Sequence, residues 1–156
     1  MSREILFRAK DINNNWVYGS YFKHIERQIC HIGNDSLKGE DIEHLIIRDS
    51  FADWNMPKTI ECVRIKPDTV GQYIEIKDKN DVEVYEGDII KFDYYGKEII
   101  SSVIEYSMGV YGFFIDGESR EADDYWTIAD LIANVGKDFE VIGNIYEDSE
   151  MLESEE

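Results

Sequence analysis

Apolar and polar residues alternate along much of the chain with the period of two that is typical of half-buried β-strands. Residues 3–10 alternate in this way, residues 11–15 form a polar turn, and residues 16–22 resume the apolar pattern, which together predict a hairpin. Similar patterns, each ended by turn-forming residues, predict further strands at 25–32, 59–65, 98–106, 110–115 and 139–146. The chain is therefore predicted to be mainly β.

The clearest pattern lies in the central stretch, residues 69–92. β-Branched and aromatic residues stand on both sides of the polar cluster 78–81, which predicts two strands joined by a turn. Gly87 interrupts the second apolar run, and a lone glycine within a strand pattern is typical of a bulge, a bend or a close backbone approach. We therefore expect residues 85–88 to form a corner where the chain enters a new strand.

Two stretches near the middle of the N-terminal half are less regular. Residues 33–41 are polar and predict a loop. In residues 42–56 the spacing of Ile42, Leu45 and Ile46 fits one face of a helix, whereas the apolar run that begins at Leu45 fits a short strand. Both types stay open for this segment, and a strand is favoured.

One helix is predicted near the C-terminus. Residues 123–134 fit two to three turns, with the body of the short helix near 126–134. Acidic residues lie near its N-terminus, where they complement the helix dipole. Its apolar face is expected to consist of Ile128, Leu131 and Ile132.

Three segments share an order that is found in a known family: residues 3–11 with 16–19, residues 65–89, and residues 139–147. They resemble the opening, the centre and the closing strand of the YopX-like proteins, a family encoded by bacteriophages and prophages. The positions that carry the resemblance are Gly71, Gln72, Tyr73, Asp78, Tyr85, Glu86, Gly87, Asp88, Ile142, Gly143 and Asn144. Three such segments in order, spanning nearly the whole chain, are hard to obtain by chance.

Two positions depart from the family pattern. After Tyr73 the family commonly has a small residue and a glycine, where this chain has the segment Ile74-Glu75-Ile76. At the following turn the family commonly has glycine, where this chain has Asp81. Aspartate tolerates positive φ better than most residues, so the turn can survive this change, while the local turn type stays open.

The resemblance implies a largely β fold with a small Src-homology-3-like barrel, an oligomeric state and no established biochemical function. In this chain the barrel is expected at about 82–146, where five short strands and a short helix before the last are typical of a small closed barrel. It is expected to pack with an N-terminal β subdomain. The predicted divisions are an N-terminal subdomain at 1–68, the barrel region at 69–146 and an acidic disordered tail at 147–156, all within one compact unit.

The net charge of the chain limits which partners it can bind. The 156 residues include 34 acidic and 16 basic side chains, a net charge of −18. Without the last ten residues, which hold six acids, 28 acidic and 16 basic side chains leave −12. Such a field repels phosphate backbones and attracts basic partners or cations, so direct binding of nucleic acid is not expected. The charge fits solubility in general, or an acidic mimic of nucleic acid that inhibits a basic host protein.

The densest group of carboxylates in the body of the chain lies at 78–88. Its members are Asp78, Asp81, Glu83, Glu86 and Asp88. Oxygen clusters bind calcium and magnesium, so a metal-dependent enzyme that uses this group is an alternative function. The spacing lacks the glycine and the final glutamate of a calcium loop, and alternate residues of a hairpin point to opposite faces. We therefore expect solvated charges around a turn, and neither a metal nor a cofactor.

Other chemical motifs are weak. The candidates for zinc or for nucleophilic chemistry are His24, His31, His44, Cys30 and Cys62, and their spacing matches no zinc pattern. Two widely spaced cysteines are typical of reduced structural thiols. Catalytic serine, phosphate-loop and metalloprotease motifs are absent from the sequence. No apolar run approaches the roughly 20 residues of a membrane span, so we expect a cytoplasmic protein of the bacterial host, without a membrane partner.

Aromatic residues gather in the barrel half of the chain: Tyr94, Tyr95, Tyr106, Tyr111, Phe113, Phe114, Tyr125 and Trp126. Most are expected to fill the core, and any exposed members would mark a binding surface, since aromatic residues are enriched at interfaces. Subunits could also pair through an edge strand at 5–10 or an apolar surface at 45–54. The sequence thus favours a non-enzymatic, homo-oligomeric interaction module whose partners are itself and a basic host or phage protein.

Overall fold

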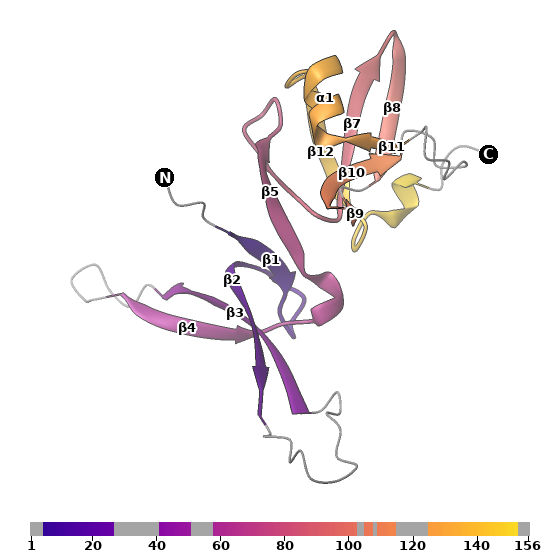
Figure 1. Ribbon diagram of the computed structural model, residues 1–156. Coiled ribbons are helices and arrows are strands. Elements are labelled where there is room, and N and C mark those ends of the chain that lie inside the picture. The colour runs from indigo at the N-terminus through magenta and orange to yellow at the C-terminus, as the bar shows by residue number, and fades with distance from the viewer. Residues whose placement is uncertain are drawn as a thin grey trace. The chain divides into compact units, whose positions relative to one another are not determined.

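The computed structural model describes residues 5–26, 41–50, 58–102, 105–107, 109–114 and 125–152 (Figure 1). These residues form a mainly β protein of antiparallel strands with one α-helix, which confirms the predicted fold class. The chain divides into two compact units, Met1–Gln72 and Tyr73–Glu156, here called unit 1 and unit 2. The division predicted after residue 68 lies slightly earlier, and the packing of both parts into one unit stays a prediction.

Unit 1 is an antiparallel sheet in which the first strand is internal. Its strands are β1 (Phe7–Lys10), β2 (Trp16–Ile25), β3 (Ile42–Ser50), β4 (Thr59–Arg64) and the first residues of β5 (Gly71–Lys77). They lie in the order β4-β3-β2-β1-β5. Arg8 of β1 is paired with Tyr18 on one side and with Gly71 on the other. The expectation that residues 5–10 form an exposed edge strand is therefore wrong, because the chain returns after β4 to place β5 beside β1.

The predicted hairpin between β1 and β2 is confirmed, and Asp11 shapes its turn. One oxygen of Asp11, Oδ1, accepts hydrogen bonds from the backbone N–H groups of Asn13 and Asn15, both at 2.8 Å. These bonds, chiefly that from Asn15, hold the pKa of Asp11 below its ordinary value. Asn14 has a φ of 68°, a conformation that asparagine tolerates.

A small core lies on one face of this sheet, and its buried members are Ala9, Val17, Ile46 and Ile65. Ile46 of β3 lies between Tyr21 of β2 and Val63 of β4. Because successive side chains of a strand alternate between faces, only Ile46 of its apolar run enters this core. The favoured strand is thus confirmed for β3. Residues 51–56 and the predicted loop at 33–41 lie outside the described residues, as does most of the strand predicted at 25–32.

Unit 2 contains two three-stranded antiparallel sheets, a short hairpin and the helix. Its elements after β5 are β6 (Glu83–Tyr85), β7 (Asp88–Tyr94), β8 (Lys97–Ser102), β9 (Glu105–Ser107), β10 (Val110–Phe114), β11 (Tyr125–Thr127), α1 (Ile128–Asn134) and β12 (Phe139–Asn144). One sheet has the order β12-β7-β8 and the other β11-β10-β9, while β5 pairs with β6 (Figure 1). The predicted turn at 78–81 and corner at 85–88 are both confirmed.

One hydrophobic core joins the sheets, the hairpin and the helix of unit 2. Its buried members are Ile74, Val84, Ile90, Phe92, Ile99, Phe113, Leu131 and Phe139. Short strands that surround one core are consistent with the predicted Src-homology-3-like barrel at about 82–146, in a loose form. Among the described residues the two sheets are separate hydrogen-bonded ladders, so the cylinder is open.

The segment predicted as one strand at 98–106 forms two strands in different sheets. β8 pairs with β7, whereas β9 pairs with β10. Ile99 of β8 is buried in the core, while Tyr106 of β9 is 59% exposed. The chain changes sheets within this apolar run because both sheets cover the same core; residues 103–104 lie outside the described residues.

The helix α1 begins at Ile128, later than the predicted start at 123, since the preceding residues extend into β11. Thr127 is its N-cap, and Thr127 Oγ1 accepts a hydrogen bond from Asp130 N at 3.2 Å. Asp130 Oδ2 accepts one from Thr127 N at 2.9 Å, which completes a capping box. These bonds fix where the helix starts. The hydroxyl of Thr127, which donates to Asp130 Oδ2 at 2.7 Å, and then Thr127 N hold the pKa of Asp130 below its ordinary value.

The inner face of α1 also differs from the prediction. Leu131 is fully buried and Ile128 packs against the core, but Ile132 is 41% exposed. Val135 packs against the core in its place, because positions four apart lie on one helix face. No helix in the part of the chain that the structure describes is long and apolar enough to span a membrane.

After β12 the chain forms a turn and a 3-10 helix, Ser149–Leu152. Asp148 Oδ2 accepts a hydrogen bond from Asn144 N at 3.0 Å, and Asp148 N donates to Asn144 O at 2.8 Å. Residues 147–152, predicted as part of a disordered tail, thus have regular structure that these local bonds explain. Residues 153–156 lie outside the described residues.

Candidate functional site

The two units differ strongly in charge. Unit 1 contains 10 basic and 11 acidic residues, a net charge of −1, whereas unit 2 contains 6 basic and 23 acidic residues, a net charge of −17. Nearly all of the charge of the chain therefore belongs to unit 2. Any site in unit 2 lies in a field that attracts cations and basic groups and repels phosphates.

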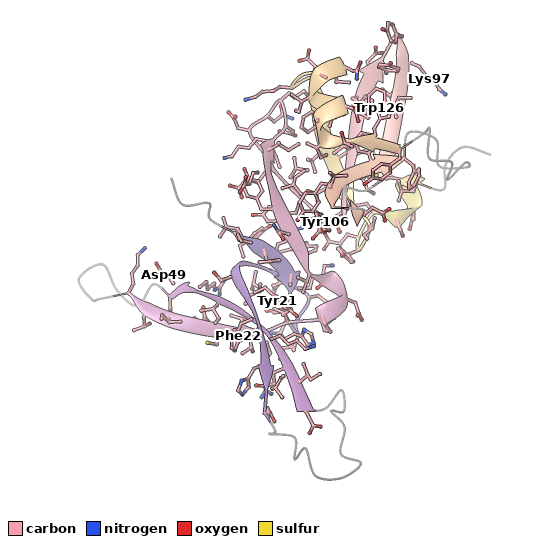
Figure 2. The ribbon with its side chains drawn as sticks, in the orientation of Figure 1. Tyr21, Phe22, Asp49, Lys97, Tyr106 and Trp126 are labelled. Carbon is pink, nitrogen blue, oxygen red and sulfur yellow. The ribbon has the colours of Figure 1, made fainter. Side chains whose placement is uncertain are left out.

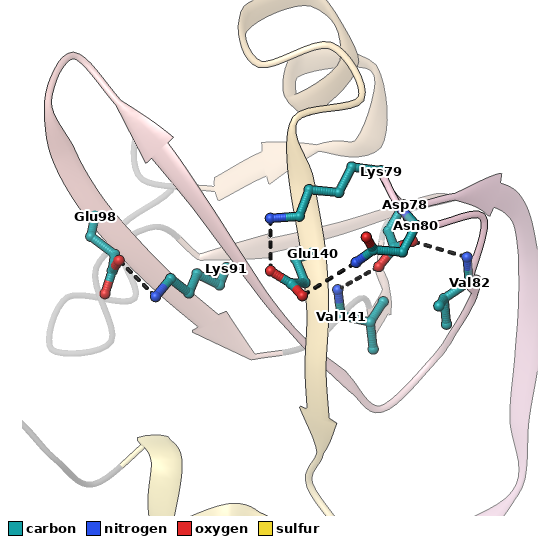
Figure 3. Close-up of polar contacts among 8 residues, drawn as sticks. All are labelled: Asp78, Lys79, Asn80, Val82, Lys91, Glu98, Glu140 and Val141. Atoms are coloured by element: carbon teal, nitrogen blue, oxygen red, sulfur yellow. Dashed lines mark hydrogen bonds and ion pairs between the residues drawn. The ribbon is translucent and has the colours of Figure 1, made fainter.

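Asp78 is one of two buried carboxylates of the predicted acidic group, with 2% of its surface exposed. Its Oδ1 accepts hydrogen bonds from Asn80 N at 2.8 Å and Val82 N at 2.9 Å, and its Oδ2 accepts one from Val141 N at 3.0 Å (Figure 3). Burial alone raises the pKa of Asp78, but the three N–H donors outweigh it and the pKa lies below its ordinary value. Asp78 thus closes the β5–β6 turn and joins it to β12.

Asp88 and Glu83 have related structural roles. Asp88 is 1% exposed, and its Oδ2 accepts a hydrogen bond from Tyr85 N at 2.8 Å across the corner. Glu83 Oε2 accepts from the hydroxyl of Tyr85 at 2.8 Å, and its Oε1 lies 3.7 Å from Lys77 Nζ. Both acids therefore hold the hairpin and the corner in shape.

The five predicted metal candidates do not form a common ligand set. Asp81 is exposed and has a φ of 62°, and Glu86 is half-buried at the corner. Asp78 and Asp88 are buried at different turns, and each accepts bonds from its own backbone donors. Among the described residues, no group of three or more His, Cys, Asp or Glu side chains is placed to hold a metal ion.

A surface ion pair covers the buried Asp78. Lys79 Nζ lies 2.7 Å from Glu140 Oε2, and Asn80 Nδ2 donates to Glu140 Oε1 at 3.2 Å (Figure 3). The bond to Lys79 holds the pKa of Glu140 below its ordinary value, and the same bond raises the pKa of Lys79. This pair links the β5–β6 turn to β12 a second time.

Several of the positions that carry the family resemblance meet at the corner between β6 and β7. Gly87 has a φ of 86°, and a Cβ placed there would lie 2.9 Å from Tyr146 Cε2. Gly87 O accepts a hydrogen bond from Ile145 N at 2.9 Å, and Asp88 is paired with Asn144 in the ladder. Two family segments far apart in sequence thus form one structural corner that requires glycine at Gly87.

The closing segment is shaped by a bulge at Ile142, between Val141 and Gly143. A Cβ on Gly143 would lie 2.6 Å from Asp148 Oδ2, and Asn144 Oδ1 accepts a hydrogen bond from Tyr146 N at 3.1 Å. At the other end of the pattern, Gly71 and Gln72 pair with β1, and Tyr73 packs on Tyr85 with ring centroids 5.4 Å apart. All of these contacts position backbone or core.

The predicted histidine and cysteine candidates are separate where they are described. His44 Nδ1 lies 2.6 Å from the hydroxyl of Tyr21. His24 is exposed on β2, and Cys62 is a free, exposed cysteine on β4. The remaining two, Cys30 and His31, lie outside the described residues.

The aromatic residues of unit 2 divide between core and surface. Phe113 is fully buried, and the ring of Trp126 lies 6.4 Å from it and 6.2 Å from Phe92. Tyr106 is 59% exposed and Tyr95 is 92% exposed. Figure 2 labels Tyr106 and Trp126, both in unit 2. The others, Tyr94, Tyr111, Phe114 and Tyr125, are half-buried.

An open hollow lies where the β7–β8 turn meets the end of α1. It has a volume of about 270 Å³, and its lining residues are Asp93, Tyr94, Tyr95 and Asn134. The rings of Tyr94 and Tyr95 meet at 70° with centroids 4.6 Å apart. The hollow therefore combines aromatic faces with a carboxylate and an amide.

The sequence indicated only half of this hollow. Tyr94 and Tyr95 belong to the predicted aromatic group, whereas Asp93 and Asn134 were missed. A local signal exists for Asp93, since its Oδ1 accepts a hydrogen bond from Gly96 N at 2.9 Å, and aspartate side chains commonly bond to the backbone of a nearby turn. Asn134 joins it only through the fold.

The profile of a family described as YopX protein matches residues 6–153, nearly the whole chain. The match includes the central and closing segments on which the resemblance rests, and most of the opening one. Among curated proteins, none matches the sequence.

Proposed function

The chain belongs to the YopX family, and from that premise we propose that it is a phage- or prophage-encoded, non-enzymatic protein that binds other proteins in the cytoplasm of a bacterial host. Unit 2 binds a basic host or phage protein. Unit 1 provides the contact through which copies of the chain form a homo-oligomer.

The observation that carries the first part is the net charge of −17 on unit 2 beside −1 on unit 1. Charge of one sign steers a partner of the opposite sign and excludes partners of the same sign. At about 0.15 M salt the Debye length is about 8 Å, so these charges act mainly near contact. A protein with a basic face is the partner that fits.

The same charge favours a more specific second candidate, in which unit 2 mimics nucleic acid and occupies the binding face of a basic host protein. The two candidates differ in one measurable property. A mimic competes with DNA or RNA for its partner, whereas an adaptor binds the partner together with its nucleic acid.

The acidic group gives little support to a metal-dependent enzyme. Asp78 uses both oxygens on three backbone donors, and Asp88 is buried at another turn. A metal at this group would have to displace hydrogen bonds that hold the β5–β6 hairpin.

For self-association, the supporting feature is the outer face of β2, β3 and β4. Phe22 is 48% exposed and is paired with Leu45, and the exposed Cys62 is paired with Ile47. These residues lie on the face opposite Ile46. Figure 2 labels Phe22 beside the inward-facing Tyr21. Two copies that meet here bring nearly neutral units together, which avoids the repulsion between two acidic units.

The test is affinity capture of the tagged full chain from the bacterial host that carries the phage. We expect a stoichiometric basic protein that survives a wash at about 0.15 M salt and is released at about 0.5 M. The capture is repeated with a variant that lacks the acidic tail. In this variant the deletion should begin at residue 153, so that Asp148, which hydrogen-bonds to Asn144 at the end of β12, is kept. Loss of the partner already at about 0.15 M salt would contradict the proposal.

Light scattering of the purified protein tests the second part. We expect an oligomer that becomes smaller when Phe22 is replaced by Ser, and that is unchanged in a Tyr106→Ser control. Both side chains are about half exposed, at 48% and 59%, so neither change should prevent folding. A monomer in the wild type would overturn self-association and leave the basic partner untouched.

A further inference from the structure

The hollow at the β7–β8 turn has a composition that selects for cations. Its four lining residues are two tyrosines, an aspartate and an asparagine. Lys97, which follows the turn, extends outward from the start of β8 (Figure 2). Among the residues that the structure describes, no basic side chain lines the hollow, and the hollow lies in the unit with a net charge of −17.

The aromatic rings that line the hollow pack against the core of unit 2 through Tyr94. Tyr94 meets Trp126 at 87° with ring centroids 4.8 Å apart, and Trp126 packs beside Phe92 of the core. Tyr94 is thus a fixed wall, and Tyr95 meets it at 70° as an outer wall. Faces of aromatic rings attract guanidinium and ammonium groups.

The turn presents Tyr95 at a cost in backbone energy. Tyr95 and Gly96 have φ values of 53° and 79°, the pattern of a type I′ turn. Asparagine, aspartate or glycine is preferred at the first of these positions, and a bulky residue with positive φ is uncommon. The strained tyrosine, 92% exposed, contributes almost nothing to the core, which is typical of a residue kept for binding.

Two side chains, Asp93 and Asn134, provide oxygen acceptors for a cation. Asp93 places a carboxylate at the rim of the hollow, fixed by its hydrogen bond from Gly96 N at 2.9 Å. Asn134 Nδ2 donates to Asp130 O at 2.8 Å, so the amide oxygen of Asn134 is the end that can accept. A planar guanidinium can stack on a ring while it donates hydrogen bonds in its own plane, whereas an ammonium has three donors but no planar face to stack.

We propose that this hollow binds an arginine side chain of a basic protein segment, stacked on the tyrosines and hydrogen-bonded to Asp93 and Asn134. The proposal rests on the proposed function and names the contact through which unit 2 holds its partner. The volume of about 270 Å³ suits one side chain, since pockets for whole small ligands measure about 300–1,000 Å³.

The experiment is a titration of the ¹⁵N-labelled full chain, at about 0.15 M salt, with an arginine–glycine repeat peptide. The comparison peptides carry lysine or citrulline in place of arginine; citrulline keeps the shape and lacks the charge. We expect shifts at Gly96 N and at the side-chain amide of Asn134, strongest for arginine and absent for citrulline. Shifts elsewhere on unit 2, without these, would overturn the site.

Matched variants separate the site from general attraction. We expect Tyr95→Ala to weaken binding about tenfold, the effect of losing one cation–π contact. Asp93→Asn, which keeps the acceptor for Gly96, should weaken it about fivefold. Tyr106→Ala removes another exposed tyrosine, and Asp138→Asn removes another exposed carboxylate of unit 2; both should leave binding within about twofold.

If the site variants and the controls weaken peptide binding equally, the arginine site is wrong, while the proposal that unit 2 binds a basic partner is unaffected. Absence of binding by every peptide would contradict both. Saturation by free arginine amide with the affinity of the peptide would assign the hollow to a small free cation and overturn the protein segment as ligand.

Discussion

Units 1 and 2 use their acidic residues in different ways. Among the described residues of unit 1, Asp11 accepts backbone hydrogen bonds at a turn, and three other acids form ion pairs along β3 and β4: Arg48 with Glu61, Lys58 with Asp49, and Arg64 with Glu43. In unit 2, five aspartates accept hydrogen bonds from backbone N–H groups at turns and caps: Asp78, Asp88, Asp93, Asp130 and Asp148. Among its described residues, unit 2 also forms three ion pairs, which use Lys77, Lys79 and Lys91.

This contrast explains how unit 2 accommodates a large excess of acid. A carboxylate bound to backbone N–H groups is stabilised by charge-assisted hydrogen bonds and needs no cation. Exposed ion pairs contribute about 0–1 kcal/mol each, so unit 1 gains little from its pairs except neutrality. Other described acids of unit 2, such as Glu105, Asp138 and Glu150, are exposed at the surface.

The largest expected effect on stability comes from Asp78. Asp78→Ala leaves three backbone donors without their acceptor, so we expect the free energy of unfolding of unit 2 to fall by about 3 kcal/mol. Asp78→Asn keeps an acceptor and should cost less. Urea unfolding followed by hydrogen exchange of β7 and β12 amides measures both. The control is Asp138→Asn, which removes the same charge from an exposed loop; an equal loss there would contradict the role of Asp78.

Lowering the pH also tests how much Asp78 stabilises unit 2. The folded pKa of Asp78 lies below the ordinary value of 3.8. Its stabilisation is therefore complete above that value and is lost as pH falls through the folded pKa. We expect the difference in unfolding free energy between wild type and Asp78→Asn to be constant from about pH 7 to about pH 5 and to shrink below about pH 4. A difference that stays constant at about pH 2 would contradict a lowered pKa.

Salt should affect the two units in opposite directions. Screening reduces the self-repulsion of unit 2, so its amides should become better protected from exchange between about 0.05 and 0.5 M salt, by about 1 kcal/mol. In unit 1 the same change weakens exposed ion pairs and should lower protection by about 0.5 kcal/mol or less. If salt changes the exchange protection of β2 and β7 amides equally, the proposed electrostatic difference between the two units is contradicted.

The smallest effect concerns the two departures from the family pattern. Glu75 and Asp81 have φ values of 65° and 62° at the positions where the resemblance expects glycine. Glu75→Gly should therefore stabilise unit 2 by about 0.5 kcal/mol, and Asp81→Gly by less, since aspartate tolerates this conformation. Glu75→Gln controls for the lost charge. Thermal unfolding of the three variants measures the differences, and destabilisation by Glu75→Gly alone would contradict relief of strain.

Local patterns in the sequence predicted most of the strands, because apolar and polar residues alternate along segments such as β1 and β4. The first turn of α1 was predictable from Thr127 and Asp130, which have the spacing of a capping box with aspartate in place of glutamate. The division of residues 98–106 between two sheets was not predictable, because an apolar run carries no mark of where the chain changes sheet. It depends on the shape of the whole core.

The roles of the acidic residues were the hardest to predict. Asp78 was expected to be a solvated turn residue, but Val141, far along the chain, donates to it and closes water out. The hollow likewise needs Asn134 to meet Asp93, which only the folded chain achieves. Both sites depend on contacts between segments far apart in the sequence, whereas the periodicity of the sequence reports only on residues close together in the chain.

The decisive measurement is capture of the host partner by the wild type and by two charge-matched double variants at about 0.15 M salt. One variant neutralises exposed acids of unit 2, Glu105→Gln with Glu150→Gln, and the other neutralises exposed acids of unit 1, Glu26→Gln with Asp68→Asn. We expect a stoichiometric basic partner that the unit 1 variant retains and the unit 2 variant loses severalfold. Equal recovery by both variants, or an acidic partner, would contradict binding through the acidic unit.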